Sequence, residues 1–85
     1  MLVQCLDSEF DVPDVLIDKF VKDFDGLPGS GRLDLLLDLR HNIYEIIDCV
    51  SMEPELIEEP EYMMDFVKAL AMKKALEKHG ILYDA

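Results

Sequence analysis

Residues 32–51 form an almost unbroken helical pattern of large apolar side chains. At about 100° per residue, ten of them fall within an arc of about 200° on a helical wheel. They are Leu33, Leu35, Leu36, Leu37, Leu39, Ile43, Tyr44, Ile46, Ile47 and Val50. One neighbouring helix cannot cover so wide an arc. The pattern therefore predicts that this helix is either the centre of the fold or part of a subunit interface.

Two further helices are expected on either side of this segment. Residues 13–25 form a one-sided amphipathic pattern that stops at the glycine-rich segment 26–31, within which Ser30 is the expected N-cap of the second helix. Residues 60–79 form a less regular helical pattern, and Gly80 suits the position just after a helix. Between them, residues 52–60 read as an acidic linker with room for one helical turn.

The fold class follows from these patterns and from the length of the chain. Eighty-five residues, of which 51% are hydrophobic, suit one folded domain at residues 1–85. We predict an all-α fold, a three- or four-helix bundle with a central, broadly apolar second helix. Residues 1–6 fit an extended arm and a single helical turn equally well. A chain this small has little room for a deep substrate cavity besides its core, so we expect no enzyme.

Charge is the strongest signal in the composition. Nineteen acidic and eight basic residues give a net charge of −11, and residues 1–60 alone hold 15 acids and 4 bases. Such a field repels nucleic acids and anionic membranes, because binding either requires Lys or Arg. It favours a partner protein with a basic surface, for example a nucleic-acid-binding protein. Acidity that serves solubility alone is the other explanation.

The acidic residues can be assigned to helix faces and to the linker. Side chains three or four positions apart on a helix stand about 5–6 Å apart, an interval comparable to the phosphate spacing of a nucleic-acid strand. If the rows face one way, they form a broad anionic surface for a partner. The candidate partner-binding residues are Asp14, Asp18, Asp25, Asp34, Asp38, Glu45, Asp48, Glu55, Glu58 and Glu59.

A second candidate surface lies on the last helix. Tyr62, Ala69, Met72 and Leu76 form an apolar patch beside the main apolar stripe of residues 60–79. The patch either packs against the segment Ile81-Leu82-Tyr83 or offers a surface to a partner or to a second subunit.

Catalytic, metal-binding and cofactor motifs are not evident. Asp38 and His41 would be the first ligands of a metal in the row on residues 32–51, but that row points away from the apolar arc and reads as a solvated face. Cys5 and Cys49 stand outside any CxxC motif and are expected to be buried and unreactive in a reducing cytoplasm. Residues 1–10 lack a basic region and a long apolar run, so we expect no signal peptide, and no run of about 20 apolar residues predicts a membrane span.

The sequence favours a non-enzymatic, acidic protein-binding module that engages a basic surface of a partner. An inhibitor, a DNA mimic, an anti-defence protein and an antitoxin-like regulator are all of this kind. The alternative is a structural homo-oligomer, such as a small phage or plasmid assembly component, built through the second or third helix. A metal-dependent enzyme is the third hypothesis.

Overall fold

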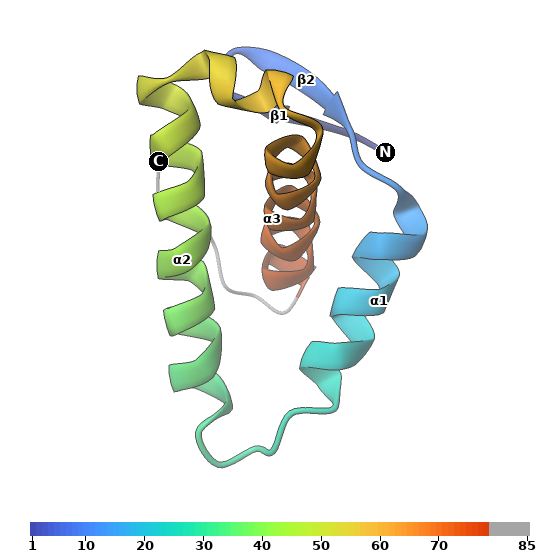
Figure 1. The fold of residues 1–85 in the computed structure, drawn as a ribbon. Coiled ribbons are helices and arrows are strands. Elements are labelled where there is room, and N and C mark those ends of the chain that lie inside the picture. The colour runs from blue at the N-terminus through green and yellow to red at the C-terminus, as the bar shows by residue number, and fades with distance from the viewer. Residues whose placement is uncertain (79–85) are drawn as a thin grey trace.

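A computed structural model gives the fold of the chain and describes residues 1–78. The described part is mostly helical, with a small antiparallel sheet at the N-terminus (Figure 1). Its elements are, in chain order, β1 (Leu2–Cys5), β2 (Ser8–Asp11), α1 (Asp14–Asp25), α2 (Arg32–Met52), the 3₁₀ helix η1 (Pro54–Glu58) and α3 (Pro60–Lys78). The three α-helices begin and end within one residue of the predicted segments, except that predicted residue 79 and Gly80 lie outside the described residues.

The third helix, and not the second, occupies the middle of the fold. α1 and α2 lie on two sides of α3 (Figure 1), and α3 supplies six buried residues: Phe66, Ala69, Leu70, Ala71, Ala75 and Leu76. α2 buries only Leu36, Ile43 and Val50, which recur every seven residues and form one narrow row. The predicted central position of the second helix is therefore not confirmed. The irregular pattern of residues 60–79 has a physical reason, because a helix covered on several sides needs apolar residues around its circumference.

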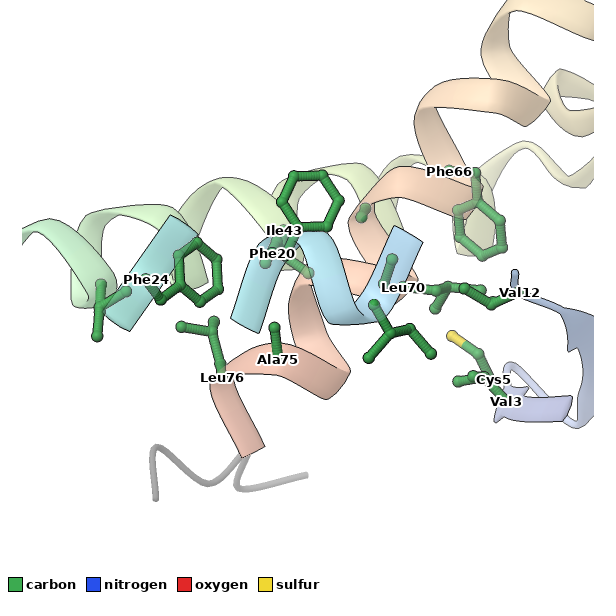
Figure 2. Packing of buried hydrophobic residues seen from close by; sticks show 14 of the residues in the cluster. Val3, Cys5, Val12, Phe20, Phe24, Ile43, Phe66, Leu70, Ala75 and Leu76 are labelled. Carbon is green, nitrogen blue, oxygen red and sulfur yellow. The ribbon is translucent and has the colours of Figure 1, made fainter. Parts of the chain in front are cut away.

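The first eleven residues form a hairpin instead of a helical turn. Val3 pairs with Phe10 and Gln4 with Glu9 across the two strands. Alternation along β1 directs Val3 and Cys5 into the core, where Figure 2 shows them beside Val12 and Leu70. Phe10 packs edge-on against Phe66 of α3, with ring centroids 5.0 Å apart. The expectation of a purely helical fold thus holds for residues after 13, and the hairpin covers one end of α3.

The link between α1 and α2 is held by an arginine and not by the predicted serine cap. The N-cap position of α2 is Gly31, with a φ of 81°, and no side chain caps the helix there. Instead, the Arg32 guanidinium donates hydrogen bonds to the carbonyl oxygens of Asp25 (2.9 Å) and Leu27 (2.6 Å). These bonds tie the end of α1 and the linker after it to the start of α2, and the bond to Asp25 satisfies a carbonyl that the helix end leaves without a partner.

Candidate protein-binding surfaces

The acidic side chains of α2 form one row on the outer side of the helix. Asp34, Asp38, Glu45 and Asp48 are all exposed, and they stand opposite the row of Leu36, Ile43 and Val50 that faces the core. Glu45 lies 3.2 Å from His41 Nε2. Among residues 1–78, the other three carboxylates make no ion pair. Four acids in this row, hereafter the α2 acidic row, therefore present nearly uncompensated negative charge.

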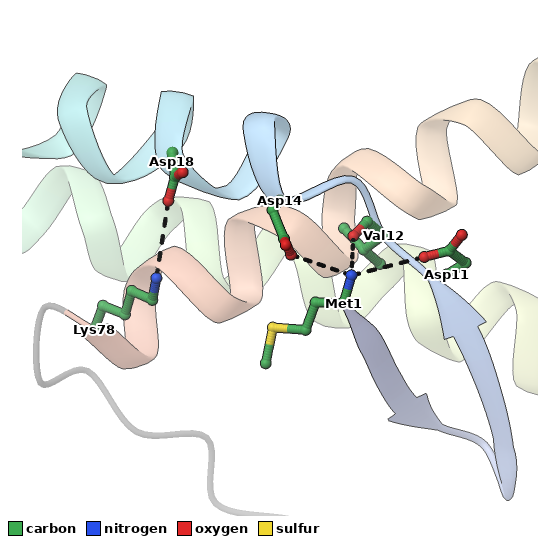
Figure 3. A network of polar contacts seen from close by, with 6 residues as sticks. All are labelled: Met1, Asp11, Val12, Asp14, Asp18 and Lys78. Carbon is green, nitrogen blue, oxygen red and sulfur yellow. Dashed lines mark hydrogen bonds and ion pairs between the residues drawn. The ribbon is translucent and has the colours of Figure 1, made fainter.

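Two acidic side chains of α1, those of Asp14 and Asp18, lie beside cations. The Asp14 carboxylate is 3.1 Å from the N-terminal ammonium of Met1, which also lies 3.7 Å from Asp11 (Figure 3). The Asp18 carboxylate is 4.0 Å from Lys78 Nζ at the end of α3. Asp25 is exposed at the end of α1 and has an interaction partner. Part of the negative charge of α1 is thus offset within the molecule.

The ten predicted partner-binding acids do not share one face. All ten are exposed, as expected, but α3 stands between α1 and α2 (Figure 1). The carboxylates of Asp14 and Asp18 therefore lie apart from the α2 acidic row. Glu55, Glu58 and Glu59 belong to η1 or follow it, so they extend the acidity beyond the C-terminal end of α2. The structure therefore divides the ten acids between α2 with the η1 segment that follows it and α1 on the other side of α3.

The predicted apolar patch of α3 is mostly turned toward α2. Ala69 and Leu76 are buried, and Tyr62 and Met72 are half-buried. Three of the four, Tyr62, Ala69 and Met72, line a cleft between α2 and α3, whereas Leu76 packs within the core and is not accessible to a partner. The predicted packing against Ile81-Leu82-Tyr83 lies outside the described residues.

Sequence reasoning missed an exposed group of leucines at the start of α2. Leu33, Leu35 and Leu37 are 61%, 52% and 39% exposed, although the helical pattern assigned all three to the apolar arc. They flank the buried Leu36 on both sides of the helix. A helical wheel carried no signal for this exposure, because it shows where apolar side chains point but not how many neighbouring helices cover them.

The two cysteines differ in accessibility. Cys5 is buried, and this burial raises the pKa of its thiol, partly offset by the nearby Lys73 ammonium. Cys49 is exposed, which corrects the expectation that both thiols are buried. It lies close to Tyr62, and the pKa of the Tyr62 hydroxyl is raised by desolvation first and then by the neighbouring Cys49, Asp65 and Glu53 side chains.

Neither a metal site nor a membrane helix is found in the described residues. Within residues 1–78, no three His, Cys, Asp or Glu side chains gather as metal ligands, and His41 instead pairs with Glu45. No helix in this part of the chain has the length and apolarity to cross a membrane.

Comparison with protein-family models, with curated proteins and with solved structures gave no match to this chain.

Proposed function

We propose that this chain is a non-enzymatic protein-binding module, and that the α2 acidic row engages a basic surface of a partner protein. The observation that carries the proposal is the geometry of Asp34, Asp38, Glu45 and Asp48, which stand in line and point outward with a single imidazole beside them. Complementary charge speeds the encounter of two proteins and selects the partner.

A nucleic-acid-binding protein has a basic surface of the required kind. An inhibitor that occupies this surface, a DNA mimic and an antitoxin-like regulator are the finer forms of the proposal. Because both cysteines carry free thiols, a reducing compartment such as the cytoplasm suits this role.

Two variants with equal net charge test the proposal. The first neutralises the α2 acidic row through Asp34→Asn, Asp38→Asn, Glu45→Gln and Asp48→Asn. The matched control neutralises four exposed acids elsewhere through Asp7→Asn, Glu9→Gln, Asp23→Asn and Glu61→Gln. Each protein, immobilised, is exposed to host lysate at about 0.1 M and about 1 M salt, where the Debye length falls from roughly 10 Å to roughly 3 Å.

The expected result is a partner that the unaltered chain and the control retain at low salt and release at high salt. The α2 acidic row variant should not retain it. Equal loss of the partner from both variants would mean that binding depends on net charge alone. Retention of the partner by both variants would mean that the α2 acidic row does not take part in binding.

A structural homo-oligomer is the second candidate, and the exposed leucines of α2 favour it. Leu33 and Leu37 stand four residues apart on one side of α2 and expose apolar area to solvent, and a second copy of α2 offers a matching surface. Light scattering over a range of concentrations measures the mass. A dimer that Leu33→Gln with Leu37→Gln dissociates supports this function, whereas a monomer at millimolar concentration eliminates it.

A further inference from the structure

The cleft between α2 and α3 has apolar walls and a polar mouth. Its volume is about 290 Å³. The walls are Leu39, Ile43 and Ile46 of α2 with Tyr62, Ala69 and Met72 of α3. The exposed side chains of Asn42, Asp65 and Lys68 stand at its mouth. Ligand pockets in proteins commonly combine apolar walls with a few polar groups in this way.

The size of the cleft limits what it can hold. Pockets for drug-sized ligands measure roughly 300–1,000 Å³, so this cleft lies just below that range. It can take one large apolar side chain, such as Leu, Phe or Trp, more readily than a whole cofactor. Anchors of this kind, set in a pocket, supply much of the affinity in protein–protein interfaces.

The charged residues around the mouth of the cleft determine which residues of the partner can lie next to the entering side chain. Asn42 is four residues after Asp38 and three before Glu45, so the α2 acidic row borders the cleft along α2. Asp65 adds a carboxylate from α3, against the single ammonium of Lys68 among the lining residues. A side chain that enters here is accommodated best when Lys or Arg residues flank it. A second copy of this chain suits the cleft poorly, because its own net charge is −11.

We infer that the α2–α3 cleft receives one large apolar side chain from an amphipathic basic helix of the partner, whose Lys and Arg residues lie along the α2 acidic row. The inference rests on the proposed function and adds the kind of partner segment. A helix fits because the cleft and the row run side by side along α2. A helix with apolar residues on one side and basic residues on the next can meet both at once.

A synthetic helical peptide with Leu on one face and Lys on the other is the probe, and methionine methyl NMR is the readout. Met72 lines the cleft, whereas Met52 is 84% exposed and lies outside it. We expect the peptide to shift the Met72 methyl signal and to leave that of Met52 in place. A matched peptide with Ala in place of each Leu should bind at least ten-fold more weakly and leave Met72 unshifted.

A variant pair locates the contact. Met72→Gln keeps a similar volume but puts an amide in the cleft, so it should weaken binding of the Leu peptide about ten-fold and leave the Ala peptide unaffected. Met52→Gln is the matched control and should change neither. If Met72→Gln disturbs the fold by circular dichroism, the methyl shifts of the unaltered chain still decide the question.

The outcomes separate the inference from the proposed function. Salt-dependent peptide binding that leaves the Met72 signal unmoved overturns the inference about the cleft, but it is consistent with binding by the α2 acidic row. Absence of binding at low salt counts against both. A Met72 shift that grows with protein concentration in the absence of peptide would mean that a second copy of the chain occupies the cleft. A ten-fold gain in affinity for the Leu peptide on deletion of residues 79–85 would mean that the chain's own C-terminal segment occupies it. Either result overturns the inference.

Discussion

Cys5 and Cys49 show how position decides the chemistry of one residue type. The thiolate is the reactive form, and it must be reachable by the reagent. Cys5 is buried with a raised thiol pKa, whereas Cys49 is exposed on α2. We predict that a disulfide reagent at pH 8 modifies Cys49 in the folded protein and reaches Cys5 only in denaturant. Mass spectrometry of the digested protein measures both. Equal labelling of the two without denaturant would contradict the buried position of Cys5.

The raised pKa of Cys5 also predicts how stability depends on pH. A group whose pKa is higher in the folded state keeps its proton there after the unfolded chain has lost it. The stability it contributes is complete below the ordinary thiol pKa and is lost as pH rises through the folded value. Urea unfolding at pH 7 and pH 10 should therefore show a smaller loss of stability in Cys5→Val than in the unaltered chain. Tyr62, whose pKa is also raised, acts in the same direction in both proteins and cancels in the comparison.

The turn of the hairpin β1–β2 holds two residues in an unfavourable backbone conformation. Leu6 and Asp7 occupy the two central positions with φ angles of 51° and 61°, as a type I′ turn requires. An L-residue with a Cβ pays roughly 1–2 kcal/mol in this region, and Asp tolerates it better than Leu. We predict that Leu6→Gly is more stable than Leu6→Ala by about 1 kcal/mol, the reverse of the usual order. Both lose the leucine side chain, so the difference in urea unfolding reports the backbone alone. If Ala is the better residue, the turn is not strained.

The same turn explains why the hairpin could not be predicted. Two-residue hairpins are recognised by Asn-Gly or Asp-Gly, and Leu6-Asp7 carries neither signal. The strands are four residues each, too short for alternation to exclude a helical turn. The three helices, in contrast, were predictable because each extends over three or more turns of periodic sequence between Pro and Gly.

Which helix lies in the middle could not be predicted from periodicity. A helical wheel shows where apolar residues point, but not how many neighbours meet them. α2 has the wider apolar arc, yet it buries one row and leaves Leu33 and Leu35 largely in solvent. For the candidate surfaces, exposure of the acids followed from the sequence, but their division between two sides of α3 needed the packing of the helices. The cleft needed both helices at once, and only its α3 wall was visible as a patch.

The net charge of −11 should destabilise this chain at low salt. The described ion pairs involving Asp14, Asp18 and Glu45 are exposed, and such pairs contribute only about 0–1 kcal/mol each. Repulsion among the remaining carboxylates opposes the compact state until salt screens it. We predict that Tm rises by about 4–8 °C between about 0.01 M and about 1 M NaCl, which corresponds to roughly 1 kcal/mol for a chain of this size. The variant with a neutralised α2 acidic row should show a smaller rise, because its net charge is −7.

The variant with a neutralised α2 acidic row also tests whether the acidity binds a partner or serves solubility alone. A net charge of magnitude roughly 2–8 keeps a small domain soluble, so −7 suffices and −11 exceeds the need. If the α2 acidic row serves a partner, its removal should raise Tm at low salt and abolish partner capture, a gain in stability with a loss of function. The control variant of equal charge should gain in Tm and keep its partner. A row that serves solubility alone predicts that both variants stay dissolved and that capture does not differ between them.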